Sequence, residues 1–219
     1  MPVAGAAGGP RDRTRVATVA LHSLQTFSLE HLHEKPAMTS PPVAFEQDLR
    51  YPIGPIDKST PLAAGERAQR IDAIAAAPAQ LRVAVAGLSD EQLDTPYRPG
   101  GWTVRQTVHH VADSHMNAFV RLRLGLTEDN PTIKPYDEKA WSELPDMQLP
   151  IEVSLKLLDG LHERWAHLLR AQPSTAFERQ IFHPENGPMT LDALLSMYAW
   201  HGKHHTAHIT ALRRRQGWS

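Results

Sequence analysis

Apolar residues recur at helical spacing in four long segments of this chain, and proline-containing stretches separate those segments. The pattern predicts helices over residues 60–87, 103–126, 151–171 and 190–216. A long proline-rich stretch, 127–150, joins the second helix to the third. Amphipathic helices of this length stabilise one another by burying their apolar faces together. The sequence therefore predicts an all-α fold, a four-helix bundle with long crossover loops.

Local signals predict where two of these helices begin and where one ends. Thr103 is followed three residues later by Gln106, which is the pattern of a capping box at the start of the second helix. Thr190 is a suitable N-cap for the fourth helix. Gly217 follows that helix at the position where a left-handed glycine often ends one.

The first helix is less regular. Thr60 and Pro61 fit an N-cap followed by a proline at the first helical position. Pro78, however, lies inside the periodic segment, where proline removes a helical hydrogen bond and disfavours the helical conformation of the residue before it. We therefore expect this helix to be kinked or split at Pro78.

A short segment before the fourth helix, 177–189, favours a strand-like or irregular hairpin with Asn186 and Gly187 as its turn. The first 43 residues have no clear period and are rich in alanine, glycine, proline and arginine. We interpret residues 1–43 as a flexible N-terminal extension, or as sequence before the true start, with Met38 as a second candidate start. The bundle is then expected over residues 44–219.

The composition excludes several classes of protein. The formal net charge is -1, so no strong positive field would attract nucleic acid or an anionic membrane. The chain has no cysteine, which excludes disulfides, thiolate metal ligands and a cysteine nucleophile. No apolar stretch is long enough to span a bilayer, and we recognise no export signal. We expect a cytoplasmic protein that binds neither nucleic acid nor membranes.

Histidine is unusually abundant in one part of the chain. There are 13 histidines, and four of them fall within residues 201–208. Helical geometry places His201 and His205 one turn apart, toward the apolar face of the fourth helix. Two imidazoles at this spacing can bind one divalent cation, although the pair alone is weak evidence. His204 and His208 form an alternative pair that points further from this face.

The second helix also contains histidines. Its periodicity places His115 in the middle of the apolar stripe and His110 well away from the centre. Periodicity therefore favours His115 as a third ligand, but a neutral histidine buried in a core is also common. Helical periodicity alone therefore leaves the choice between His110 and His115 open.

Four long motifs, in this order, resemble one known family: GGWTVRQTVHHVADSHMN, IKPYDEKAWSELPD, LHERWAHLLR and YAWHGKHHTAHITALRRRQGWS. The chain resembles the YfiT branch of the DinB/YfiT superfamily of metal-binding four-helix bundles, whose members are described as metal-dependent hydrolases. The resemblance begins near Tyr51 and continues to Ser219. It does not include the N-terminal extension.

The resemblance implies a ligand set of His110, His201 and His205, and it implies His208 as a residue that could orient a ligand. It further implies one divalent ion per subunit, with zinc expected and nickel or another divalent ion as alternatives, and a homodimer. Three histidines leave coordination positions open, as in catalytic zinc sites. The expected activity is hydrolysis of a small-molecule substrate by activated water.

A hydrolase of this kind needs a general base, and the candidates are Asp113, Asp137 and Glu138. Superfamily relatives also suggest an alternative function, which is a metal-dependent S-transferase that uses a low-molecular-weight thiol such as bacillithiol in detoxification. A third interpretation is a metal-binding module without enzymatic activity. The absence of cysteine is compatible with both enzymatic readings.

Overall fold

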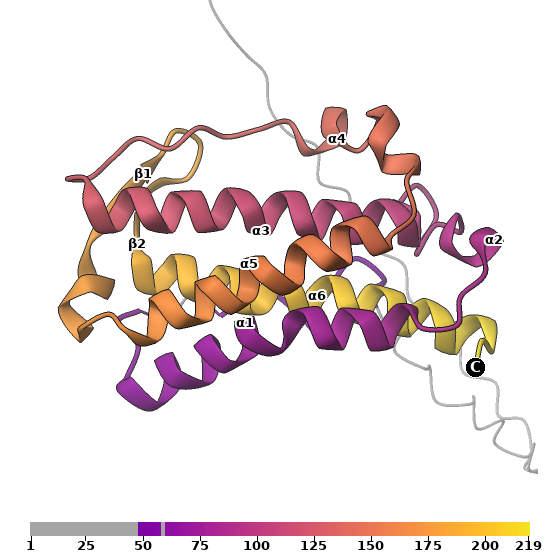
Figure 1. The fold of residues 1–219 in the computed structure, drawn as a ribbon, viewed down its shortest axis with the longest axis horizontal. Helices are drawn as coiled ribbons and strands as arrows, with labels where there is room; N and C mark the ends of the chain where they lie inside the picture. Colours follow the sequence, from indigo (N-terminus) through magenta and orange to yellow (C-terminus); the bar gives the residue numbers. More distant parts are fainter. Residues whose placement is uncertain (1–47, 58–59) are drawn as a thin grey trace, which may run out of the picture. The chain divides into compact units, whose positions relative to one another are not determined.

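The computed structural model describes residues 48–57 and 60–219. Four long helices lie alongside one another and confirm the predicted bundle (Figure 1). They are α1 (Ala64–Val85), α3 (Val104–Thr127), α5 (Glu152–Arg170) and α6 (Leu191–Gln216). The predicted N-terminal extension, residues 1–43, lies outside the described residues.

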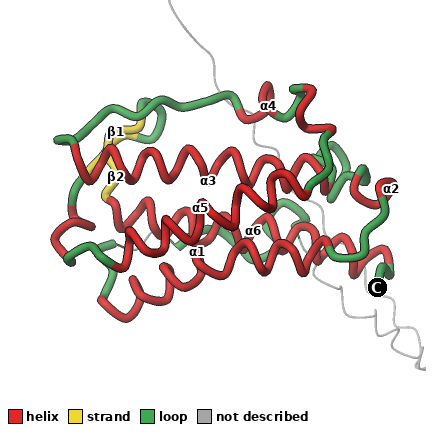
Figure 2. Tube along the Cα trace, in the orientation of Figure 1, coloured by secondary structure: helices red, strands yellow, loops and turns green. Residues whose placement is uncertain are grey.

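Short elements occupy the connections between the long helices. They are α2 (Asp90–Leu93), α4 (Glu138–Trp141) and the 3-10 helices η1 (Pro145–Gln148) and η2 (Ser174–Glu178). The strands β1 (Gln180–His183) and β2 (Gly187–Thr190) form the antiparallel hairpin just before α6 (Figure 2). His183 pairs with Gly187, so the hairpin connection is residues 184–186, and Gly187 belongs to a strand and not to a two-residue turn.

The predicted ends of α3 and α6 are confirmed. The Thr103 hydroxyl accepts a hydrogen bond from the Gln106 backbone N–H at 3.1 Å, and the Gln106 side chain accepts one from the Thr103 N–H at 3.0 Å. Thr190 caps α6 by accepting from the Ala193 N–H at 3.1 Å. Gly217 ends α6 with φ of 67°, the left-handed conformation that favours glycine.

The predicted start of the first helix is wrong. α1 begins at Ala64, and neither Thr60 nor Pro61 has the expected capping role. The physical reason is a contact distant in sequence: the Leu62 N–H donates to the buried carboxylate of Asp192 in α6 at 3.0 Å. Arg67 donates to both oxygens of the same carboxylate at 2.8 Å, so this buried ion pair fixes the beginning of α1 against α6.

Pro78 does not split α1, which is one continuous helix over Ala64–Val85. A proline at this position leaves the carbonyl four residues earlier, that of Ile74, without its helical donor. The Nδ1 atom of His162 in α5 lies 2.6 Å from this carbonyl oxygen and forms the hydrogen bond instead. A neighbouring helix therefore replaces the bond that the proline removes.

The apolar core of the bundle forms two clusters, one toward each end. In α6 the first cluster includes residues up to Ala199, and the second begins at Ile209. In α3 the second cluster includes residues up to Ala112, and the first begins at Ala118. The histidine-rich part of α6 therefore lies between two apolar clusters. No helix of the described part is long and apolar enough to cross a membrane.

Candidate metal centre

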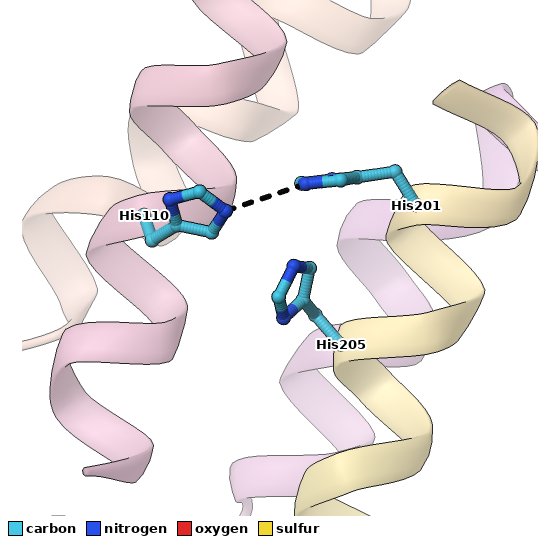
Figure 3. Close-up of side chains that lie close together, drawn as sticks. All are labelled: His110, His201 and His205. Carbon is cyan, nitrogen blue, oxygen red and sulfur yellow. Dashed lines mark hydrogen bonds between the residues drawn. The ribbon is translucent and has the colours of Figure 1, made fainter. Parts of the chain in front are cut away.

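Three histidines from two helices converge in the bundle interior. His110 comes from α3, and His201 and His205 come from adjacent turns of α6 (Figure 3). One ring nitrogen from each lies within 4.8 Å of the other two. The Nε2 atoms of His110 and His201 are 3.3 Å apart. The residues that the family resemblance implied as ligands are thus brought together, while metal binding itself stays a prediction.

The chemistry of these donors fits a divalent ion. Two nitrogen ligands at roughly 2.0–2.1 Å from one tetrahedral ion are about 3.4 Å apart, close to the distance between the Nε2 atoms of His110 and His201. His205 makes no hydrogen bond to any described residue, and its Nδ1 is buried without a partner. Buried polar atoms without partners are rare in native proteins. An ion bound at the other ring nitrogen, which faces His110 and His201 (Figure 3), would give the imidazole of His205 a polar partner, while Nδ1 would stay without one.

Burial keeps these rings neutral. It lowers the pKa of His110 to about 4, and it lowers the pKa values of His201 and His205 well below the usual histidine value of 6.5. The neighbouring rings lower the pKa values of His201 and His205 further, because one protonated imidazole disfavours another. At pH 7 each of the three residues therefore offers a lone pair, as zinc, nickel and related ions require.

His115, which periodicity favoured as a ligand, is fully buried next to the cluster and not in it. Both of its ring nitrogens have other partners. Its Nε2 lies 3.1 Å from His201 Nδ1, and its Nδ1 lies 2.8 Å from His162 Nε2. His115 therefore contacts the outer nitrogen of a ligand and cannot use the same atoms to bind an ion.

These contacts form a series of hydrogen bonds, and the carbonyl at its end determines which atom donates in each bond. The Ile74 carbonyl can only accept, so His162 donates from Nδ1 and, being neutral, accepts at Nε2. His115 must then donate from Nδ1 to His162 and accept at Nε2 from His201 Nδ1. The Nε2 atom of His201 consequently carries a lone pair that faces His110. We call Ile74, His162, His115 and His201 the histidine relay.

The expectation that His208 orients a ligand is not supported by its contacts. His208 Nε2 lies 2.9 Å from His204 Nε2, and its ring stacks on that of Tyr97 at 4.0 Å between centroids. His204 in turn stacks on Trp200. The pair therefore packs among aromatic rings outside the three-histidine cluster, and His115 has the contact that was expected of His208.

His201 also lines a pocket of about 180 Å³. The other polar lining residues come from α3, α4, β1, α6 and the loops between α3 and α6. They include Ser114, Arg121, Tyr136, Glu138 and Tyr198. A small molecule in this pocket would lie close to one of the three candidate ligands.

Comparison with known proteins identifies the family. Residues 73–209 match the family model of the DinB superfamily. The chain belongs to the DinB superfamily. It is 53% identical over 171 residues to a protein of Bacillus cereus named "Putative metal-dependent hydrolase", and this match covers 78% of the chain and 99% of that protein. A protein of Bacillus thuringiensis subsp. konkukian with the same descriptive name is also 53% identical over 171 residues, with the same coverage.

A solved structure is also similar to this chain. YfiT from Bacillus subtilis is 50% identical in sequence and superposes with a TM-score of 0.76, covering 78% of this chain and 99% of that one. Its structure is described as that of "a probable metal-dependent hydrolase with an unusual four-helix bundle topology". The fold and the family that the motifs implied are therefore confirmed.

The three candidate bases lie in different environments. Glu138 lines the pocket together with His201, and burial raises its pKa. Asp137 instead caps α4, with its carboxylate accepting from the Ala140 N–H at 2.9 Å. Asp113 is half-buried outside this pocket, where burial and the nearby charge of Asp146 raise its pKa to about 6. Glu138 is the candidate that shares a cavity with a candidate ligand.

Sequence reasoning missed His162 and Arg121. The third predicted helix received no chemical role, although His162 lies on the same face as Leu155, Leu158 and Trp165. The sequence offered one signal for His162, which is a histidine within an otherwise apolar helix face. Its partner, the Ile74 carbonyl that Pro78 leaves without a helical donor, lies in another helix. Arg121 gave no local signal, because its importance depends on the lack of an ion pair among the described residues.

Proposed function

We propose that this protein is a metal-dependent hydrolase whose ion, zinc in the first instance, is held by His110, His201 and His205. One observation carries the proposal: three neutral imidazoles converge, two of them buried and one, that of His201, partly buried and lining a pocket. Three protein ligands leave a position for water or substrate, which is the arrangement of catalytic sites. The names of the relatives support the same activity.

The bound ion would supply acidity to a water molecule and polarise a substrate carbonyl. The protein's own residues supply the remaining requirements. Glu138 accepts the proton of the attacking water on its carboxylate, for which a pKa raised by burial is suited. The relay holds His201 with its Nε2 lone pair toward the cluster. The apolar side chains of Ile133 and Leu194 restrict water in the pocket.

The test begins with metal content. The untagged protein should carry about one divalent ion per chain by elemental analysis. His110→Ala and His205→Ala should abolish this binding, whereas His204→Ala, the matched control on the same helix, should retain it because His204 is not one of the three converging histidines and forms its hydrogen bond with His208. Absence of metal in the wild type, even after reconstitution with zinc or nickel, would contradict the proposal.

Activity is then measured on a panel of small esters and amides. We expect product release that requires the ion and water alone, and that Glu138→Gln reduces by about 100-fold or more without changing metal content. Product formation that depends on added thiol would instead identify the S-transferase. We also propose, from the family resemblance, a cytoplasmic homodimer, which native mass measurement and localisation would test.

A further inference from the structure

Arg121 differs from the other arginines that are largely buried. Arg67 pairs with Asp192 at 2.8 Å, and Arg105 pairs with Asp94 at 2.7 Å. Arg121 is only 9% exposed, yet it forms none of the ion pairs found among the described residues. Buried charges in proteins are normally paired, because an isolated charge is costly to remove from water.

The hydrogen-bond partners of Arg121 are both neutral. One guanidinium nitrogen donates to the Tyr198 hydroxyl at 3.2 Å, and the other donates to the Lys134 carbonyl at 3.1 Å. These contacts hold the guanidinium in place but bring no negative charge. A guanidinium has five N–H groups, so donors remain for a further acceptor.

The pocket next to Arg121 is the one that His201 lines. The Tyr136 hydroxyl in this pocket is buried and makes no hydrogen bond of good geometry, although it lies near Ser114. Apolar side chains, including Ile133 and Leu194, complete the lining. The pocket thus has a guanidinium that forms no ion pair with the described residues, an unused hydroxyl and apolar lining side chains, with the carboxylate of Glu138 near enough for Arg121 to lower its pKa.

We propose that this pocket binds a small-molecule substrate through a carboxylate group that pairs with Arg121. A planar carboxylate matches the planar guanidinium, and the Tyr136 hydroxyl is a second donor. Glu138 and Glu185 also line the pocket, and their charges oppose a dianion such as phosphate more strongly than a monoanion. That the bound molecule is hydrolysed rests on the function proposed above, whereas the binding does not.

The experiment compares butanoate with butanamide, which have nearly the same shape but differ in charge. Both are titrated into the full-length, metal-loaded protein and followed by NMR chemical shifts. Butanoate should bind at least about tenfold more tightly, and Arg121→Met should remove this preference, since hydrogen bonds to charged groups are the stronger class. Arg123→Met, an exposed arginine on the same helix, is the matched control and should retain it.

A second variant should change the affinity for butanoate in the opposite direction, and it can be tested even if Arg121→Met does not fold. Glu138→Gln removes a negative charge from the pocket and should tighten butanoate binding several-fold. Repeating the titration after chelation of the metal separates a carboxylate held by Arg121, which still binds, from one held by the ion, which does not. Equal binding of butanoate and butanamide by the wild type would overturn the proposal, as would a preference for butylamine that Glu138→Gln removes.

The two proposals can fail independently. Carboxylate binding that depends on Arg121, in a protein that turns over no ester or amide, would leave this inference standing and refute the hydrolase. Metal-dependent hydrolysis that is indifferent to a carboxylate on the substrate and to Arg121→Met would support the hydrolase and refute carboxylate binding by Arg121.

Discussion

His201 and His205 stand one turn apart on α6 and face the same cluster, but their outer nitrogens differ. The Nδ1 of His201 is held by His115 at 3.1 Å and, through the relay, by a backbone carbonyl. The Nδ1 of His205 is buried without a partner. The protein therefore fixes the tautomer and direction of one ligand in advance and leaves the other to be oriented by the ion. Of the two candidate ligands on α6, one is therefore preorganised and the other is not.

Acid should destabilise the folded protein by protonating buried histidines of the cluster and the relay, and this is the largest effect that we expect. Unfolded histidine binds a proton near pH 6.5, whereas His110 in the folded protein does so at about 4. Between these values the unfolded state binds more protons, so stability decreases as pH falls and levels off below about pH 4. His110 alone contributes a loss of about 3 kcal/mol between pH 7 and pH 4.

The relay residues should add to this loss, because burial also lowers the pKa values of His115, His162 and His201. Urea unfolding of the metal-free protein at several pH values measures the effect. Bound metal should delay it to lower pH, since the ion competes with protons for the same lone pairs. Stability of the metal-free protein that is unchanged from pH 7 to pH 5 would contradict this account.

His162→Ala should weaken metal binding by about 10- to 100-fold, because partners of this kind orient the ligand that they contact. It leaves the Ile74 carbonyl and the His115 N–H without partners. His162→Gln should restore much of the affinity, since its amide can donate to Ile74 and accept from His115. His167→Ala, at an exposed position of the same helix, is the control. Competition with a chelator gives the affinities.

The same variants test the difference between His201 and His205 when the metal-free protein is observed by ¹⁵N NMR. The wild type should show His201, His115 and His162 protonated at Nδ1, while His205 should show a mixture of tautomers. Loss of the fixed tautomer of His201 in His162→Ala, with the fold intact, would link affinity to orientation. A fully folded His162→Ala variant with unchanged metal affinity would show that the relay has only a packing role.

Pro78→Ala is expected to have the smallest effect. Replacing a proline inside a helix by alanine usually stabilises a protein by about 3 kcal/mol. Here the Ile74 carbonyl already has a donor, and a new N–H at position 78 would compete with His162 for it. We expect a gain of less than about 1 kcal/mol in urea unfolding, with metal affinity reduced a few-fold. A gain near 3 kcal/mol would mean that the relay does not compensate for the proline.

These contacts also explain what the sequence could and could not predict. The ends of α3 and α6 were predictable because Thr103, Gln106 and Gly217 act on their own neighbours. The start of α1 was not, since it depends on Asp192, more than a hundred residues away. The start of α1 and the continuity of this helix past Pro78 both depend on a partner on another helix.

The candidate site divides in the same way. Helical spacing alone placed His201 and His205 on one face, as the structure confirms. It favoured His115 over His110, because periodicity measures burial and His115 is the more deeply buried residue. The family resemblance was needed to select His110. The role of His162 depends on a carbonyl in a different helix, which no pattern within α5 could reveal.

Pro78 has a consequence for protein design. A designer who moved His110, His201 and His205 into another helical bundle would transfer three ligands without the element that orients one of them. The transfer would also need His115, His162 on a third helix and, on a fourth helix, a proline four residues after an inward-facing carbonyl. The smallest transferable unit of this site therefore extends over all four long helices, and an apparently unfavourable residue belongs to it.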